Sequence, residues 1–115
     1  MAELLIPEGV ARNPVNGLRL RLGHNVETMS GTKTLLPQDA QVQMLDPNGG
    51  NDLMLPVEEA SQGLFFIVKN TTGAAENIVV KEDGGGGKET IGSGKWGIFV
   101  CDGTSWESMG LLSFA

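Results

Sequence analysis

The apolar run from Trp96 to Cys101, which leads directly into a tight-turn sequence, is the feature that most constrains this fold. In GKWGIFVCDGTSWESM, residues 94–109, the pair Asp102-Gly103 separates that run from a mixed polar and apolar segment. This order is typical of a β-hairpin. Alternate residues of a strand point to opposite faces, and both faces are apolar here, with Trp96, Ile98 and Val100 on one and Phe99 and Cys101 on the other. We therefore expect a central strand of an all-β domain that is covered on both faces.

A second run, Leu64 to Asn70 (LFFIVKN), has the same two-faced character. Two such strands in one small domain favour a sandwich whose outer face is also buried, and association between copies supplies that cover. The apolar C-terminal sequence LLSFA is also expected to pack on the body or on a neighbour. The residues we expect at an oligomer interface are Phe65, Ile67, Phe99, Leu111 and Phe114.

The composition favours many short strands in a single domain. The chain has 115 residues, of which 17 are glycine, about twice the usual share of about 7%. Further strands are predicted over residues 32–36, 41–45, 53–55 and 77–81, and residues 57–63 are expected to form one helical turn or a loop. In the strand 41–45 the alternation predicts that Val42 and Met44 face inward and that Gln41 and Gln43 face outward. The predicted fold class is a small antiparallel β-sandwich or barrel of short strands.

Residues 1–31 are predicted to form an extended N-terminal arm, and residues 32–115 the sandwich body. The arm contains one amphipathic strand, residues 18–22 (LRLRL), with leucines on one side and arginines on the other. This strand fits either an edge of the domain or an arm that lies on another subunit, where its arginines pair with carboxylates. Residues 23–31 are polar and rich in turn formers. The residues we expect to contact a partner are Arg12, Leu18, Arg19, Leu20 and Arg21.

Charge is distributed unevenly along the chain. Residues 1–33 contain three arginines and one lysine against three glutamates, which sums to +1, whereas the remainder contains four lysines against eleven acids, which sums to −7. An acidic body repels phosphate backbones, which argues against nucleic-acid binding. No apolar run approaches the length of a membrane span, and the N-terminal sequence does not follow signal-peptide order, so we expect a protein made in a cytoplasm.

Motifs for catalysis or metal binding are weak. Cys101 is expected to be a small buried strand residue, and His24 has no companion with metal-ligand spacing. The oxygen-rich loop 46–52 departs from the calcium-binding EF-hand pattern at several positions, and the glycine run before Lys88 lacks both the first glycine and the hydroxyl residue of a phosphate loop. The sequence therefore predicts no catalytic, cofactor or metal site and no small-molecule substrate. A small hydrolase dependent on Asp83 or Glu89 is the weakest alternative.

One resemblance covers about two-thirds of the chain. The segments AQVQMLDPNGGNDLMLP, GLFFIVKNTTG, NIVVKEDGGGG and GKWGIFVCDGTSWES together resemble the small all-β modules of tailed-bacteriophage virion proteins, especially capsid decoration (cement) proteins. The features that carry the resemblance are the strand Phe66 to Asn70, the glycine-rich return, and the apolar strand that closes into Asp102-Gly103-Thr104-Ser105-Trp106.

The resemblance implies a non-enzymatic virion structural protein. It implies a homotrimer that binds the major capsid protein on the outer capsid surface and stabilises the shell, after synthesis in the host bacterial cytoplasm. The alternative is a receptor- or glycan-binding module of a phage head or tail fibre, for which Trp106 is the best candidate to stack on a sugar.

Overall fold

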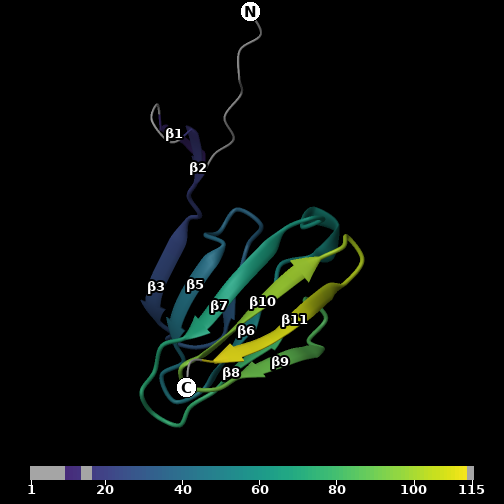
Figure 1. The fold of residues 1–115 in the computed structure, drawn as a ribbon. Coiled ribbons are helices and arrows are strands. Elements are labelled where there is room, and N and C mark those ends of the chain that lie inside the picture. The colour runs from purple at the N-terminus through teal and green to yellow at the C-terminus, as the bar shows by residue number, and fades with distance from the viewer. Residues whose placement is uncertain (1–9, 14–16, 114–115) are drawn as a thin grey trace, which may run out of the picture.

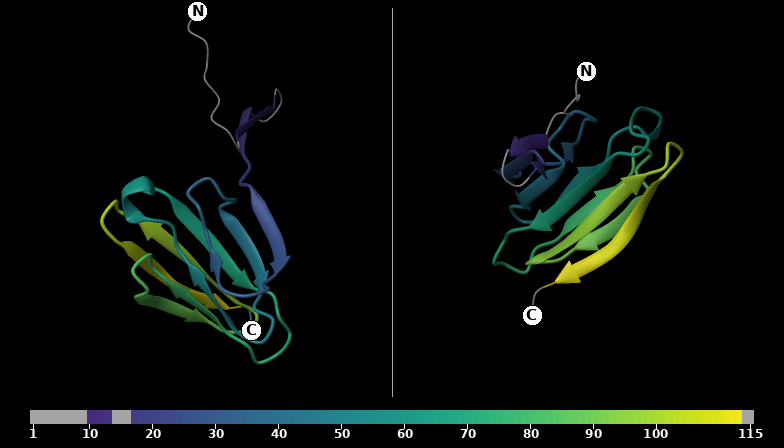
Figure 2. Two further views of the ribbon diagram at one scale, coloured as in Figure 1. Left: turned by 180° about the vertical axis from the view of Figure 1, so that it is seen from behind. Right: turned by 45° about the horizontal axis from the view of Figure 1, so that its top comes forward.

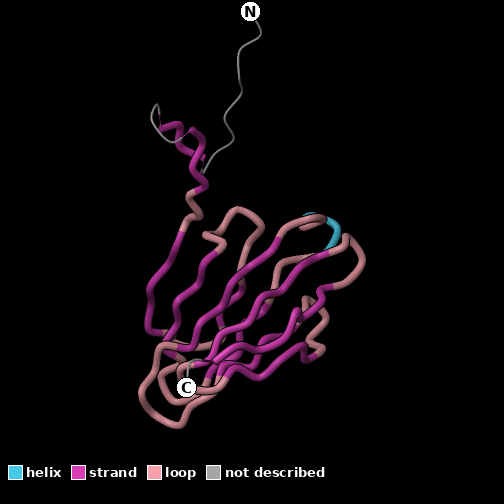
Figure 3. The backbone as a smooth tube through the Cα atoms, in the orientation of Figure 1, coloured by secondary structure: helices cyan, strands magenta, loops and turns pink. Residues whose placement is uncertain are grey.

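The computed structural model describes residues 10–13 and 17–113, and over these ranges the chain is built of strands with one short 3-10 helix (Figure 1, Figure 3). One sheet contains the strands β3 (His24–Thr28), β5 (Val42–Asp46), β7 (Phe65–Asn70), β10 (Lys95–Cys101) and β11 (Trp106–Ser113). The second sheet contains β4 (Lys33–Thr34), β6 (Asn51–Met54), β8 (Ile78–Lys81) and β9 (Gly87–Ile91). A separate ribbon consists of β1 (Val10–Asn13) and β2 (Gly17–Leu20), and the 3-10 helix is η1 (Glu58–Ala60).

The two larger sheets form a β-sandwich, which confirms the predicted all-β sandwich class (Figure 2). The strand orders are β11-β10-β7-β5-β3 in the five-stranded sheet and β4-β6-β8-β9 in the four-stranded sheet. Among the residues whose burial the structure describes, thirteen hydrophobic ones are buried between the sheets. The indole N–H of Trp106 donates a hydrogen bond to the Pro56 carbonyl at 2.8 Å, and its ring lies 5.8 Å from that of Phe66.

The sandwich is antiparallel only in its second half, so the predicted antiparallel pairing is wrong for the first. The chain passes three times from the five-stranded to the four-stranded sheet, from β3 to β4, from β5 to β6 and from β7 to β8, and it returns to the five-stranded sheet after each of these passages. Successive strands within one sheet therefore run in the same direction, and the pairs β3/β5, β5/β7, β4/β6 and β6/β8 are parallel. This first half is a flattened coil of three turns.

Antiparallel strands close the coil at its C-terminal end. Strand β9 pairs with β8, and the hairpin β10–β11 pairs with β7 through β10. The hairpin predicted over residues 94–109 is thus confirmed, and β10 lies between two other strands as expected. A β-bulge opposite Ile98 accommodates Gly110, whose φ of 104° is a conformation that glycine adopts without strain.

Strand β5 faces the opposite way from the prediction. Gln43 and Leu45 are 1% and 0% exposed and point into the core, whereas Val42 and Met44 lie half-buried on the outer side. The buried amide of Gln43 is tolerated because both of its ends are hydrogen-bonded. Its Nε2 donates to the Ala40 carbonyl at 2.7 Å, and its Oε1 accepts from Asn25 Nδ2 at 2.9 Å.

The body begins before residue 32. Strand β3 lies within the stretch predicted to be turn-rich, yet it pairs with β5 as an edge strand of the five-stranded sheet. The arm therefore contains the ribbon β1–β2, whose register pairs Val10 with Leu20 and Arg12 with Leu18. Figure 1 shows the ribbon standing apart from the sandwich, beyond the N-terminal end of β3.

Candidate functional site

Strand β7, at the centre of the five-stranded sheet, presents apolar side chains on both faces. Phe66 and Val68 are fully buried between the sheets, whereas Phe65 and Ile67 are half-buried on the outer side. The burial alternates along the strand as its sequence predicts. No helix or strand of the described chain covers the outer side of this sheet.

The neighbouring strands continue this apolar surface in register. Ile67 lies opposite Ile98 of β10 and opposite Val42 of β5, so three aliphatic residues form a row across the sheet. Phe65 lies opposite Val100 in an adjacent row. Directly opposed residues share a face and contact each other, so these five side chains form one continuous cluster.

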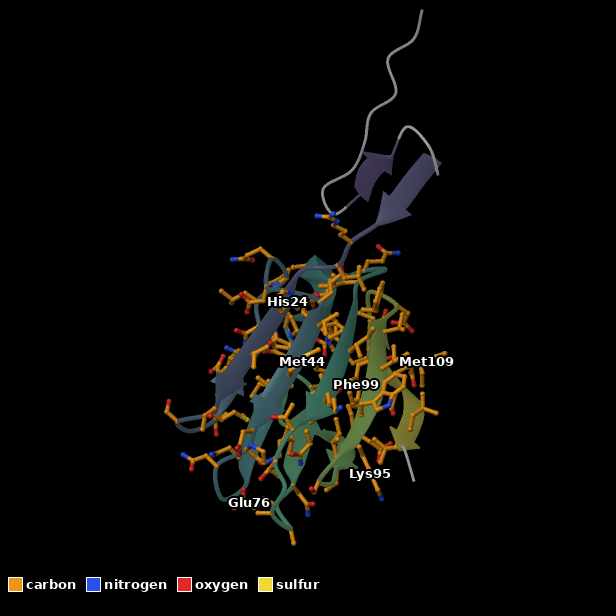
Figure 4. All side chains as sticks on the ribbon, turned by 60° about the vertical axis from the view of Figure 1, so that its left-hand side comes forward. His24, Met44, Glu76, Lys95, Phe99 and Met109 are labelled. Atoms are coloured by element: carbon orange, nitrogen blue, oxygen red, sulfur yellow. The ribbon has the colours of Figure 1, made fainter. Side chains whose placement is uncertain are left out.

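The most exposed large hydrophobic residues lie at the two ends of the same face. Val26 on β3 and Met109 on β11 are 68% and 67% exposed, and Leu112 on β11 is 50% exposed. Val26 lies opposite Met44, and Leu112 lies opposite Trp96. Figure 4 shows the sheet with its side chains and labels Met44 and Met109.

We call this surface the outer face. It consists of Val26, Val42, Met44, Phe65, Ile67, Trp96, Ile98, Val100, Met109 and Leu112. With about 4.8 Å between strands and about 3.3 Å per residue, five strands of five residues cover about 400 Å². The largest apolar patch on a typical soluble protein covers about 300 to 600 Å² and often has a function. Three charged residues of the described sheet lie on the same side: Lys69 opposite Met44 and Trp96, Glu107 opposite Val100, and Asp46 at the end of β5.

The residues predicted at an oligomer interface separate into three groups. Phe65 and Ile67 lie on the outer face, and their place in an interface stays a prediction. Phe99 is 0% exposed and lies in the core, so its assignment to an interface is wrong. The neighbours of Phe99 in β10, Ile98 and Val100, face outward instead. Leu111 lies opposite Gly97 and packs against the core, and Phe114 lies outside the described residues.

Sequence reasoning missed much of the outer face. The alternation along residues 41–45 predicts that Met44 faces the core, and Val26 lies in a stretch predicted to be turns. Leu45 is the residue that could have indicated the facing of Met44. Adjacent strand residues point to opposite faces, so an inward Leu45 requires Met44 to face outward. Val26 carried no comparable signal, since the polar residues around it hide the strand.

The arm residues predicted to contact a partner lie mostly in the ribbon. Arg12, Leu18, Arg19 and Leu20 belong to β1 and β2, where the structure describes the backbone register but not the side chains. Arg21 follows the ribbon and is exposed. The structure therefore places four of these five residues on an element that is separate from the two large sheets, and Arg21 in the connection to β3.

The loops that resemble metal or phosphate sites use their polar groups internally. In the loop 46–52, Asp46 accepts a hydrogen bond from the Asn48 N–H at 2.9 Å, and Asp52 forms a salt bridge with Lys81 at 2.8 Å. Lys88, which follows the glycine run, forms a salt bridge with Glu82 at 3.2 Å. Among the described residues, no group of three histidine, cysteine, aspartate or glutamate side chains is arranged to hold a metal ion.

Two further candidate residues have structural roles. Cys101 is buried, as predicted, and burial raises the pKa of its thiol, which disfavours the reactive thiolate. Trp106 is 0% exposed and cannot stack on a sugar, so the prediction that it binds a glycan is wrong. The exposed His24 lies at the start of β3.

Comparisons with protein-family models, with curated proteins and with solved structures found no match to this chain. In the part of the chain that the structure describes, no helix is long and apolar enough to cross a membrane.

Proposed function

We propose that this chain is a non-enzymatic assembly protein that binds a large protein surface through its outer face. The observation that carries the proposal is the register of Val42, Ile67 and Ile98, which makes the apolar surface continuous across three strands. A surface of this kind is more apolar than folding requires. Contact with a partner removes it from water, which is favourable by about 25 cal/mol per Å² of apolar area.

The resemblance to capsid decoration proteins supplies the kind of partner. A shell of major capsid proteins offers a broad surface, and a sheet face about 20 Å across without a described pocket matches such a surface better than it matches a small ligand. The proposed protein is a homotrimer on the outside of the virion, with the outer face of each copy against the shell. Each bound copy stabilises the assembled shell by mass action, because it binds the assembled state and not the free subunits.

The outer face, rather than the arm alone, is assigned to shell contact for a reason of size. A stable protein interface removes about 800 Å² of accessible surface from each partner. The side of the sheet that carries the outer face measures about 400 Å² in projection, which is about half of this requirement. Arginines of the arm add charge-assisted contacts, which contribute less when they are exposed to solvent.

The test uses a charged substitution at the centre of the outer face. Ile67→Lys places an ammonium group among Val42 and Ile98, where contact with a partner would have to desolvate it. The matched control is Val57→Lys, because Val57 is 43% exposed and lies beside η1, away from the outer face. Both variants are mixed with shells that lack this protein, and the bound fraction is measured by co-sedimentation.

We expect the wild-type chain and V57K to bind the shells, and I67K to bind at least tenfold more weakly. Circular dichroism checks that both variants are folded. Equal binding of I67K and the wild type would contradict the assignment of the outer face. Absence of shell binding by the wild-type chain would contradict the proposed function.

A further inference from the structure

The five-stranded sheet has an open edge at β3. In a parallel pair, the backbone groups of one strand point alternately toward and away from its neighbour. The Val42 N–H donates to the Gly23 carbonyl at 3.1 Å, and the Met29 N–H donates to the Asp46 carbonyl at 2.8 Å. Odd-numbered residues therefore bond to β5, and the N–H and C=O groups of His24, Val26 and Thr28 point away from the sheet. No described strand pairs with this side of β3.

The other edge of the sheet is better protected. Strand β11 is bulged at Gly110 and lies close to β9, where the Ser108 hydroxyl donates to Glu89 Oε2 at 3.2 Å. Strand β3 contains no proline, glycine or lysine that would discourage a further strand. The first turn of the coil thus leaves the edge of β3 unpaired, whereas β10 and β9 pair with the strands β7 and β8 of the last turn.

The ribbon β1–β2 is attached directly to this open strand but does not fold back onto it. Residues 21–23 connect β2 to β3, which is the length of a three-residue hairpin loop. Such a loop requires a residue with positive φ, yet the positive-φ residues of the described chain do not include Arg21, Leu22 or Gly23. The connection is therefore not a hairpin turn, and the ribbon stands away from its own β3 (Figure 2).

The ribbon and its connection to β3 carry a net positive charge, and the body of the same chain carries a net negative charge. Residues 10–22 contain three arginines and no acidic residue, a sum of +3. Residues 24–115 contain five lysines and twelve acids, a sum of −7. On the inner side of β3, Glu27 forms a salt bridge with Lys33 at 3.0 Å and accepts a hydrogen bond from Asn25 at 2.8 Å. A carboxylate that is one-third exposed thus lies next to the open edge.

We propose that β2 of one copy of this chain adds to the open edge of β3 in a second copy. The alternation LRLRL then sets the orientation of the added strand, because its leucines and its arginines lie on opposite faces of the sheet. With Leu18 and Leu20 in the positions beside Val26 and His24, the leucines extend the outer face. Arg19 then takes the register position on the side of Glu27, which gives an opposite-charge neighbour.

This exchange gives each copy one acceptor edge and one donor ribbon. Contacts of this head-to-tail kind form a closed ring when the rotation between copies closes, and three copies would give the proposed trimer. The inference does not depend on shell binding, because it concerns contacts between copies. It predicts that the arm builds the oligomer and that the outer face remains available to the shell.

The test is a disulfide that only two different copies can form. One batch of the full chain carries Leu18→Cys with an affinity tag, and the other carries Val26→Cys without a tag. The two are unfolded, mixed, refolded together and oxidised with glutathione disulfide. Leu20→Cys is tested in parallel, because a shift of two residues keeps the same face. The matched control pairs Leu18→Cys with Val57→Cys, which is also exposed but lies away from β3.

We expect a crosslinked species of twice the chain mass with V26C, at least fivefold more abundant than with V57C. The buried Cys101 does not take part. A single chain that carries L18C and V26C is oxidised as well, and a disulfide within one chain would overturn the exchange in favour of a folded-back ribbon. The proposal would also be overturned if V26C and V57C crosslinked equally with L18C and also equally with L20C.

A backbone variant tests the edge separately. Val26→Pro removes an N–H group that points away from β5, so no hydrogen bond within the sheet is lost. We expect V26P to lower the native mass measured by sedimentation, whereas Val26→Thr, which keeps the N–H group and the β-branched shape, leaves it unchanged. If V26P is folded and retains the oligomer of the wild type, the proposal is wrong. Failure of the shell-binding proposal would instead appear as unchanged binding by I67K.

Discussion

Replacement of Asn70 by alanine should destabilise the sandwich more than any surface substitution. Asn70 is 0% exposed at the end of β7. Its side-chain N–H groups donate to the carbonyls of Glu76 at 2.8 Å and Ile91 at 2.9 Å, and its oxygen accepts from the Thr72 N–H at 3.1 Å. One amide therefore joins β7 of one sheet to the last residue of β9 in the other, and also holds the connection between β7 and β8.

The expected magnitude follows from these three hydrogen bonds. Each contributes about 1 kcal/mol net, and a buried group left without its partner costs about 1 to 3 kcal/mol. N70A should therefore lower the free energy of unfolding by about 3 to 5 kcal/mol. For a domain of this size about 1 kcal/mol corresponds to about 4 °C in melting temperature, so a fall of at least about 12 °C is expected.

The measurement is urea unfolding followed by tryptophan fluorescence, with Asn77→Ala as the matched control. Asn77 is exposed, lies just before β8, and has no side-chain hydrogen bond in the described structure. N77A should change stability by less than about 0.5 kcal/mol. Asn70→Asp should be at least as damaging as N70A, because a carboxylate cannot donate to two carbonyl groups. A loss of unfolding free energy below about 1 kcal/mol for N70A would show that these three hydrogen bonds do not hold the two sheets together.

Three further outcomes are expected. Trp106→Phe leaves the Pro56 carbonyl without its donor and removes ring volume from the core, so urea unfolding should show a loss of about 2 to 4 kcal/mol. A hydrogen bond from Asn25 and the pairing with Lys33 lower the pKa of Glu27 in the folded protein. The ionised Glu27 therefore stabilises the fold above the carboxyl pKa of the unfolded chain, and this contribution is lost as pH falls through the lower pKa of the folded state. Thermal melts at decreasing pH should show a smaller loss of stability for E27Q than for the wild type. Because burial raises the pKa of the Cys101 thiol, a thiol reagent at neutral pH should label Cys101 at least tenfold more slowly in the folded protein than in urea.

Much of the fold is predictable from local patterns. The hairpin around Asp102-Gly103 and the strand ending at Asn70 are confirmed, because alternation and turn residues act over a few positions. Both strands are apolar on two faces and lie inside the sheet, as the sequence indicates. The outer face follows in part from this observation, since Phe65, Ile67 and Ile98 were recognisable as surplus apolar residues.

Other features depend on contacts between distant parts of the chain. The inward turn of Gln43 is possible because Asn25 and the Ala40 carbonyl bond both ends of its amide, and a hydropathy pattern cannot show those partners. Strand β3 is polar in sequence and becomes a strand through its parallel pairing with β5. The predicted place of Phe99 in an interface is wrong for the same reason, because the facing of a strand is set by the packing of the whole sheet.

Local patterns in the sequence are enough to specify short strands with more apolar surface than one sheet face can hide. These patterns are alternation and glycine-rich turns, which depend only on neighbouring residues. The parallel coil of the first six strands of the sandwich comes instead from contacts between distant residues, because the direction of a strand depends on which sheet the chain enters next. This coil leaves the outer face uncovered and the edge of β3 open.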